Sequence, residues 1–195
     1  MGYLGTKPAN AVLTSEQIGD GVIATADIAD NAITTAKIAA GAVVQADLAT
    51  GVAGTGPAFS AYQNASTQSI PNVTWTKVIL PLEEFDTNNN FDSTTNYRFT
   101  PTVAGYYQIN GNVSFNALSN AEILCAIYKN GSSYKYGTDM KATNVWMVNI
   151  SSLVYLNGST DYIELYVFQD SGASRTMNSI DNNRIWLNGF LARSA

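Results

Sequence analysis

The sequence contains no histidine and a single cysteine, Cys125, among its 195 residues. Histidine is the commonest general base and the commonest transition-metal ligand in proteins, so its absence removes both roles. A Ser-His-Asp or Cys-His catalytic arrangement cannot form, and neither can a disulfide bond within the chain. Cys125 stands in the apolar run ILCAIY, which predicts a small buried core residue.

Charge is also scarce, because charged residues make up only 13% of the chain, about half the usual share. The formal net charge is −5, and no basic patch is present, so we expect no binding to nucleic acid. No apolar run is long enough to span a bilayer, so we expect no membrane insertion. The first residues, MGYLGTKPAN, lack the charged leader and apolar stretch of a signal peptide.

Acidic side chains gather at only one point. Glu83, Glu84 and Asp86 are close in sequence, but they precede an asparagine run and are expected to lie in a solvated loop. The segment from Asp86 has oxygen ligands at alternate positions, as a calcium loop has. It carries Phe91 where the glycine belongs and Tyr97 where the glutamate belongs. We therefore expect no catalytic residue, no cofactor and no metal ligand, and a protein that is not an enzyme.

The clearest positive feature is a ten-residue repeat near the start. Its units read IGDGVIATAD, IADNAITTAK, IAAGAVVQAD and LATGVAGTG, and they begin at Ile18, Ile28, Ile38 and Leu48. Each unit offers one large apolar residue first and one or two more a few positions later. Such a stripe is too thin for one chain to bury, so it requires stacked copies. The first residue of each unit is therefore predicted to lie in an interface between identical chains.

The period of ten fits neither a coiled coil nor a strand. Asp-Gly, Asp-Asn and Ala-Gly in successive units indicate turns, and Thr-x-Ala-Asp and Thr-x-Ala-Lys can begin short helical turns. We expect short extended pieces and single helical turns, wound with two partner chains. The alternative is a disordered linker, which has no reason to repeat large aliphatic residues on a strict period.

The pattern changes to alternating strands after a Gly/Pro break at 54–58. Strands are predicted at about 59–63, 74–80, 97–100, 105–116, 123–129, 147–156, 161–169 and 184–192. No segment past residue 58 has the pattern of a long amphipathic helix. Eight short strands with turns between them predict an antiparallel sandwich of jelly-roll type.

Some strands are apolar on both faces. In DYIELYVFQ (161–169), one face belongs to the core of the domain: Ile163, Leu165 and Val167. The opposite face carries three aromatic residues: Tyr162, Tyr166 and Phe168. The run 147–156 shows the same in a milder form, with Met147, Leu153 and Tyr155. Because a solvated face would be polar, we predict a subunit interface there. The alternative is that a loop of the same chain covers these side chains.

One segment, FDTNNNFDSTTNYRFTPTVAGYYQINGNVSF (85–115), resembles the globular C1q-type domain, a relative of the tumour-necrosis-factor (TNF) jelly roll. The motif residues are Phe99, Gly105, Tyr107 and Ile109, and Gly105 is expected to supply backbone torsions that a side chain opposes. The gap from Phe91 to Phe99 is one residue longer than usual in the family. The turn at 129–131, the run 156–167 and the last strand, WLNGFLAR, also match.

This resemblance implies an all-β, antiparallel C1q/TNF-like jelly roll that forms a homotrimer. Some C1q-type domains bind calcium near the trimer axis, but no residues here single out such a site. The N-terminal decapeptides look like those of phage head and tail fibres. The implied organisation is a mounting segment (1–17), a trimeric stalk (18–53), a hinge (54–58) and a knob (59–195).

The implied location is the virion surface, after synthesis in the host cytoplasm, with a capsid or tail protein held through residues 1–20. Two functions stay open. In the first, the chain is a short fibre, and its knob attaches to a host-surface glycan or protein through aromatic residues of the 134–146 segment: Tyr134, Tyr136 and Trp146. In the second, it is a decoration or cement protein that stabilises the particle through its N-terminal segment.

Overall fold

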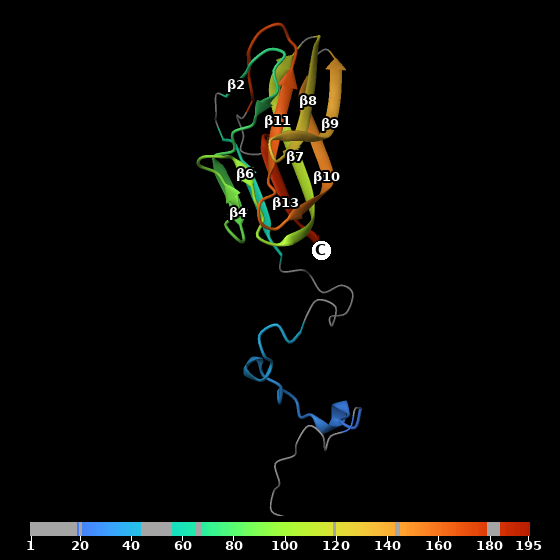
Figure 1. The fold of residues 1–195 in the computed structure, drawn as a ribbon. Coiled ribbons are helices and arrows are strands. Elements are labelled where there is room, and N and C mark those ends of the chain that lie inside the picture. Colours follow the sequence, from blue (N-terminus) through green and yellow to red (C-terminus); the bar gives the residue numbers. More distant parts are fainter. Residues whose placement is uncertain are drawn as a thin grey trace, which may run out of the picture. The chain divides into compact units, whose positions relative to one another are not determined.

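A computed structural model describes residues 19, 21–43, 56–64, 68–118, 120–142, 145–178 and 184–195 of the chain. The chain divides into two units, Met1–Val52 (unit 1) and Ala53–Ala195 (unit 2) (Figure 1). Within the described residues, no helix is long and apolar enough to cross a membrane.

Unit 1 repeats one local conformation in its described part. Single turns of 3-10 helix, η2 (Thr25–Asp27) and η3 (Thr35–Lys37), occupy the same position of successive sequence units. A residue in the left-handed region precedes each: Gly21 at φ 76° and Asn31 at φ 62°. Glycine and asparagine tolerate this region best. The predicted turns and single helical turns are therefore present in residues 21–43, whereas Ile18 and Leu48 lie outside the described residues.

Unit 2 contains two main antiparallel sheets. Sheet 1 has the order β10-β7-β13-β1-β4. Its strands are β1 (Ala58–Tyr62), β4 (Leu82–Asp86), β7 (Ala104–Leu118), β10 (Val145–Asn157) and β13 (Trp186–Ser194). Sheet 2 has the order β5-β6-β11-β8-β9, and β3 also pairs with β11. Its strands are β3 (Thr76–Lys77), β5 (Phe91–Asp92), β6 (Arg98–Phe99), β8 (Ala121–Lys129), β9 (Ser132–Ala142) and β11 (Ile163–Gln169). A small third sheet joins β2 (Ser69–Ile70) and β12 (Arg175–Thr176).

The neighbours within each sheet are mostly distant in sequence. In sheet 1, the last strand, β13, pairs with both β1 and β7, and in sheet 2 β11 lies between β6 and β8. Such non-consecutive antiparallel neighbours are the mark of a jelly roll. The predicted antiparallel jelly-roll sandwich is confirmed.

An aromatic group fills the core at one end of the sandwich. The ring of Phe59 stacks on Phe99 at a centroid distance of 4.2 Å and on Phe91 at 5.2 Å. Tyr107 meets Phe99 edge to face, and its hydroxyl donates a hydrogen bond of 2.7 Å to the carbonyl oxygen of Val103. Burial raises the pKa of Tyr107 to about 12. Three of the motif residues, Phe99, Tyr107 and Ile109, are thus fully buried.

The fourth motif residue, Gly105, is required because a side chain would not fit there, and not because of its backbone torsions. Its backbone is not in the left-handed region, so the torsional reason expected from the sequence is wrong. A Cβ atom added there would overlap the carbonyl oxygen of Arg193 and lie 2.6 Å from Cδ1 of Leu191. A glycine is needed because β13 pairs with β7 here and its register shift between Leu191 and Arg193 brings atoms of both residues close to Gly105.

The eight predicted strand runs each contain or overlap a strand, but two edge strands were expected to be loops. Glu83, Glu84 and Asp86 belong to β4, which pairs only with β1 at the edge of sheet 1. The segment expected as the loop 134–146 is mostly β9, at the edge of sheet 2. Edge strands tolerate charged side chains, so neither segment shows the apolar alternation on which the prediction depended.

Candidate functional site

Four of the large apolar side chains that sheet 1 exposes come from three of its strands. Tyr106 lies on β7, Leu153 and Tyr155 lie on β10, and Phe190 lies on β13; they are 44%, 52%, 40% and 51% exposed, respectively. Tyr155 is the cross-strand partner of Tyr106, with ring centroids 5.4 Å apart. Leu153 and Phe190 flank Gln108 from the two neighbouring strands. These four residues form one continuous surface, here called the apolar strip.

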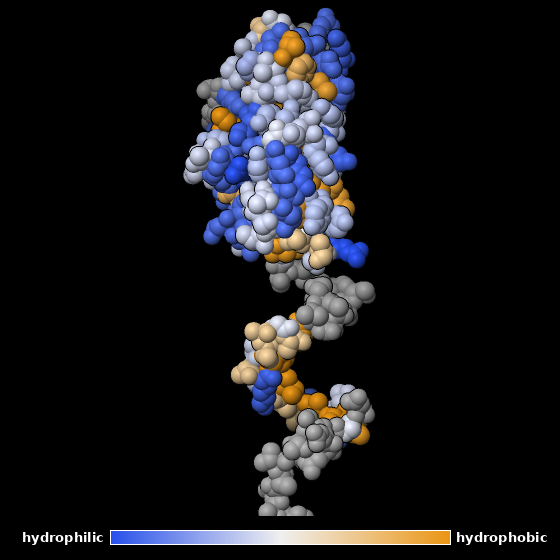
Figure 2. Space-filling model, viewed as in Figure 1, coloured by the Kyte–Doolittle hydropathy of each residue, from blue (hydrophilic) through white to orange (hydrophobic). Residues whose placement is uncertain are grey.

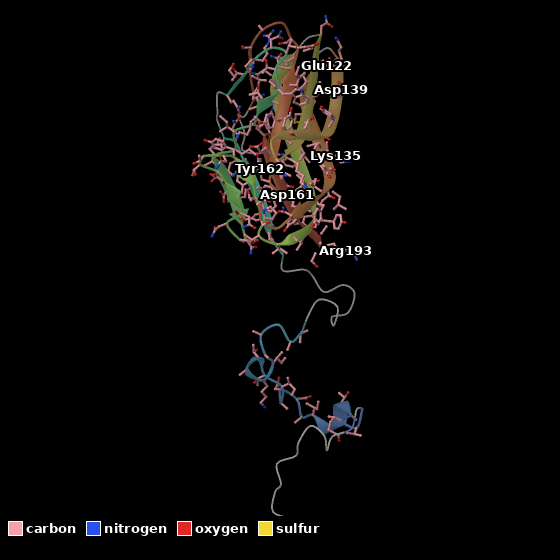
Figure 3. The ribbon with its side chains drawn as sticks, viewed as in Figure 1. Glu122, Lys135, Asp139, Asp161, Tyr162 and Arg193 are labelled. Carbon is pink, nitrogen blue, oxygen red and sulfur yellow. The ribbon has the colours of Figure 1, made fainter. Side chains whose placement is uncertain are left out.

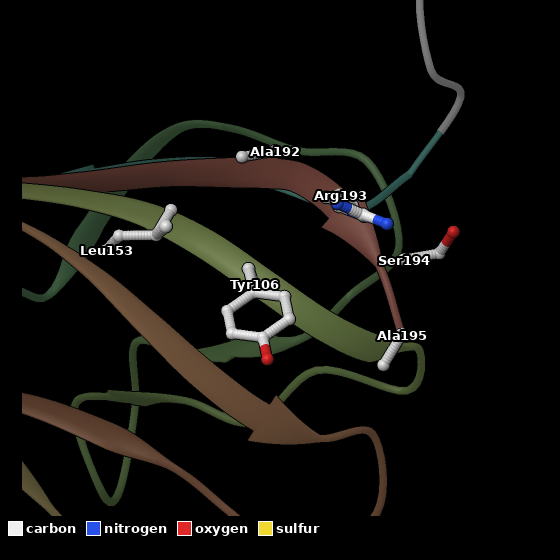
Figure 4. Close-up of a pocket in the computed structure, with 6 residues that line it drawn as sticks. All are labelled: Tyr106, Leu153, Ala192, Arg193, Ser194 and Ala195. Carbon is white, nitrogen blue, oxygen red and sulfur yellow. The ribbon is translucent and has the colours of Figure 1, made fainter.

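A pocket of about 490 Å³ adjoins the apolar strip (Figure 4). Tyr106 and Leu153 form one side of it, and the last residues of the chain, 192–195, form the other. The pocket gives the strip a hollow into which a protruding side chain can fit.

A row of amide and hydroxyl groups runs across the same face. Gln108 donates to Asn110 at 3.2 Å and to Ser151 at 3.0 Å, and the hydroxyl of Ser151 donates to Asn110 at 2.8 Å. Asn110 in turn donates to Asn188 at 3.2 Å. These four residues form the amide belt. The amide nitrogen of Asn188 donates no hydrogen bond to any residue in the described part of the chain.

The middle of this face carries no charge, whereas Arg193, Lys129 and the acidic strand β4 lie at its margins. The sequences 106–114 of β7, 147–155 of β10 and 186–190 of β13 contain no Asp, Glu, Lys or Arg. The charged residues labelled in Figure 3 lie instead on β8 and β9, just before β11 and at the end of β13. Identical groups approach one another when copies pack around a symmetry axis, so like charges there would repel. A face with an uncharged middle avoids this cost.

The predicted interface residues fall on three different surfaces. Leu153 and Tyr155 belong to the apolar strip, and Met147, also exposed, lies on the same strand, β10. Ile28 and Ile38 are exposed in unit 1, where Figure 2 shows hydrophobic side chains at the surface of residues 21–43. The remaining three lie on the outer face of sheet 2 and are half-buried: Tyr162, Tyr166 and Phe168. No partner chain is present, so the interface stays a prediction.

The aromatic residues of sheet 2 pack against rings of the same chain. Trp75, just before β3, meets Phe168 of β11 at 5.5 Å, Tyr136 of β9 at 5.6 Å and Tyr128 of β8 at 6.0 Å. Tyr128 also stacks on Tyr166 at 3.8 Å. These five residues form the aromatic cluster. The guanidinium of Arg98 lies 4.1 Å above the ring of Tyr162, which is covered separately.

The predicted attachment residues are not brought together. Tyr136 belongs to the aromatic cluster, whereas Tyr134, on the same strand, lies near the ammonium groups of Lys129 and Lys135. Trp146 is in β10, and its side chain lies outside the described residues. Three site features were missed from the sequence: Trp75, the amide belt, and the strip residues Tyr106 and Phe190. The signal for the strip was a large aromatic residue at an outward position of each of the runs 105–116 and 184–192, which otherwise place polar residues such as Gln108, Asn110 and Asn188 outward.

Comparison with known proteins identifies the fold. Vertex protein P5 of PRD1 is 18% identical, with a TM-score of 0.52, over 72% of this chain and all of that one. Murine APRIL is 9% identical, with a TM-score of 0.52, over 70% of this chain and 98% of that one. Eiger TNF from S. frugiperda is 7% identical, with a TM-score of 0.50, over 72% and 95%. No family model and no curated protein matches the sequence.

Unit 2 is therefore a TNF-like jelly roll, as the arrangement of its strands and these neighbours show. At such low sequence identities the likeness establishes the fold alone, and the function has to be argued from the surfaces of this chain.

Proposed function

We propose that this chain is a non-enzymatic structural protein of a phage particle, which forms a homotrimer and displays its TNF-like domain at the virion surface as a short fibre. The observation that carries the proposal is the uncharged middle of the outer face of sheet 1, with its exposed apolar strip. A monomer would leave this surface in water, whereas copies of the chain can bury it. The TNF-like fold shared with vertex protein P5 of phage PRD1 supports a place on a particle.

Three copies are proposed because the C1q-type resemblance implies them. Around a threefold axis, each apolar strip meets the strips of two neighbours, and aromatic residues such as Tyr106 and Tyr155 are effective anchors for such contacts. The exposed aliphatic residues of unit 1 support the same partner, because a repeat of this kind is stable only beside copies of itself. The knob then presents its other surfaces to the host.

The trimer is tested by measuring the mass of the full chain in solution by light scattering. The wild type is expected to be a trimer, and Leu153→Lys and Phe190→Lys are expected to be folded monomers by circular dichroism. Tyr134→Lys, at an exposed position on β9, is the control and should stay trimeric. The proposal would be contradicted if the wild type were a monomer, or if Tyr134→Lys dissociated while the two sheet 1 variants stayed trimeric.

Attachment is tested on the particle. Antibodies against the chain should label the virion surface in electron microscopy, and the purified trimer should compete with phage for adsorption to host cells. Labelling without competition would instead favour a decoration or cement role. The absence of labelling would contradict both the fibre role and the decoration role.

A further inference from the structure

The aromatic cluster on sheet 2 is built around Trp75, a residue from outside the sheet. Its indole ring touches rings from three strands, β8, β9 and β11, at centroid distances of 5.5 to 6.0 Å. Aromatic contacts at these distances are favourable, so the cluster is a firm surface made of several rings. The outermost ring belongs to Tyr136, which is 61% exposed, while the others are half-buried.

Within the described residues, the polar groups of this cluster have no hydrogen-bond partner. Neither the indole N–H of Trp75 nor the hydroxyls of Tyr128, Tyr136 and Tyr166 form a hydrogen bond with any residue in the described part of the chain. In the core, by contrast, Tyr107 donates its hydroxyl hydrogen to a carbonyl oxygen. Buried tyrosine and tryptophan usually find such partners. The cluster thus presents aromatic ring surfaces and four hydrogen-bonding groups, one indole N–H and three hydroxyls, to water or to a ligand.

Two ion pairs lie on the same sheet as the cluster. Glu164, only 5% exposed, pairs with Lys77 at 3.1 Å, and Lys77 also donates to the carbonyl oxygen of Asn96 at 2.9 Å. At the far side, Lys141 lies 3.8 Å from Asp170. Neither ion pair leaves a net charge to select a phosphate, a carboxylate or a cation.

We propose that the aromatic cluster is a binding site for a neutral pyranose sugar of a surface polysaccharide, with Trp75 and Tyr136 as the stacking residues. One face of a pyranose ring is lined with C–H groups that pack on an aromatic ring, and its hydroxyls both donate and accept hydrogen bonds. A ligand that needs flat apolar contact together with several polar partners matches a surface with rings and free N–H and O–H groups. An apolar peptide would leave those polar groups unpaired, at a cost.

This inference rests on the proposed function in one respect: if copies of the chain cover sheet 1, sheet 2 is left facing outward. Each trimer then carries three sugar sites, so weak individual contacts add up to firm attachment on a repetitive polysaccharide.

The site is tested with the full chain and four neutral oligosaccharides as probes: cellohexaose, maltohexaose, mannohexaose and N-acetylchitohexaose. At least one is expected to bind with a millimolar or tighter dissociation constant, measured by calorimetry and by saturation-transfer NMR. Tyr136→Ala should weaken that binding about tenfold, the scale of one aromatic contact. Tyr136→Phe, which keeps the ring, should retain most of it. The matched control is Tyr134→Ala, on the same strand but outside the cluster, and it should bind as the wild type does.

The inference is overturned if none of the four probes binds at about 10 mM, roughly tenfold above the millimolar dissociation constant expected, or if the control loses as much affinity as Tyr136→Ala. It is also overturned if Tyr136→Ala changes the mass of the purified protein in solution, because the cluster would then pack against another copy of the chain. Light scattering on the same samples separates the two proposals: a trimer that binds no sugar removes only this site, and a monomer that binds sugar removes only the trimer.

Discussion

One carboxylate, that of Asp92, organises the turn between β5 and β6. It accepts hydrogen bonds from the backbone N–H groups of Thr94, Thr95 and Asn96, and from the side chains of Thr94 and Asn96. These bonds, that from the Thr95 N–H first among them, hold the pKa of Asp92 well below its usual range of about 3.9. The charged form is therefore favoured more in the folded chain than in the unfolded one.

It follows that Asp92 stabilises the fold above about pH 4 and that this contribution is lost as the pH falls towards the lowered pKa. We predict that Asp92→Asn melts at a lower temperature than the wild type at pH 7, and that the difference narrows steadily between pH 4 and pH 2. Thermal melts at several pH values measure it. The control is Asp139→Asn, whose carboxylate forms no hydrogen bond with the described residues. A constant difference across this pH range would contradict the assignment.

Gly105 gives a second prediction at the scale of one residue. A methyl group at this position meets β13 at Arg193 and Leu191, so Gly105→Ala has to push the two strands apart. Overpacking of this kind costs about 1–3 kcal/mol. Chemical denaturation should therefore show a lower free energy of unfolding for Gly105→Ala. The control is Ala192→Ser, an exposed change on β13, which should unfold as the wild type does. Equal stability of the two variants would rule out the steric explanation.

At the scale of strands, the sequence predicted those strands in which apolar and polar residues alternate. Runs such as 105–116 have one apolar face, so burial fixes them as strands and places residues such as Tyr107 and Ile109 in the core. β4 and β9 were missed because edge strands are held by backbone hydrogen bonds and need no apolar face. Alternation also revealed that Phe168 lies on a second apolar face. It could not reveal the cover, because Trp75 is contributed from a distant part of the chain.

The two apolar faces are expected to respond differently to mutation. Phe168 packs on Trp75 within the chain, so Phe168→Ala should lower the free energy of unfolding by about 1–3 kcal/mol and leave the trimer intact. Phe190 is exposed on sheet 1, so Phe190→Ala should weaken the trimer and have little effect on the folding of a subunit. Denaturation curves and light scattering over a dilution series separate the two effects. If Phe168→Ala instead dissociates the trimer, the subunit interface includes sheet 2, as the alternating pattern of 161–169 predicted.

At the scale of the molecule, both units leave apolar groups exposed in a single chain. Unit 1 exposes an aliphatic residue at matching positions of its repeats, as at Ile28 and Ile38, and unit 2 exposes the apolar strip. The two units differ in conformation, one built of single turns and the other of sheets, so shared local structure cannot explain the common feature. A requirement for copies of the same chain explains both, because each surface exposes apolar side chains that identical copies can bury.

The absence of charge in the middle of sheet 1 leads to the last prediction. Asn188 lies in the amide belt, and its amide nitrogen donates no hydrogen bond within the described residues. A threefold axis through this face would bring three copies of it close together. Asn188→Asp is nearly isosteric, so the folded subunit should be unaffected. Three carboxylates that share a poorly solvated space resist ionisation, which raises their pKa values and destabilises the trimer at neutral pH. The variant should be trimeric at pH 4 and dissociate by pH 8, as followed by light scattering, and added salt should restore part of the association. Asn64→Asp, exposed just after β1, is the matched control and should remain trimeric at both pH values. A variant that stays trimeric at pH 8 would mean that this face lies away from the axis.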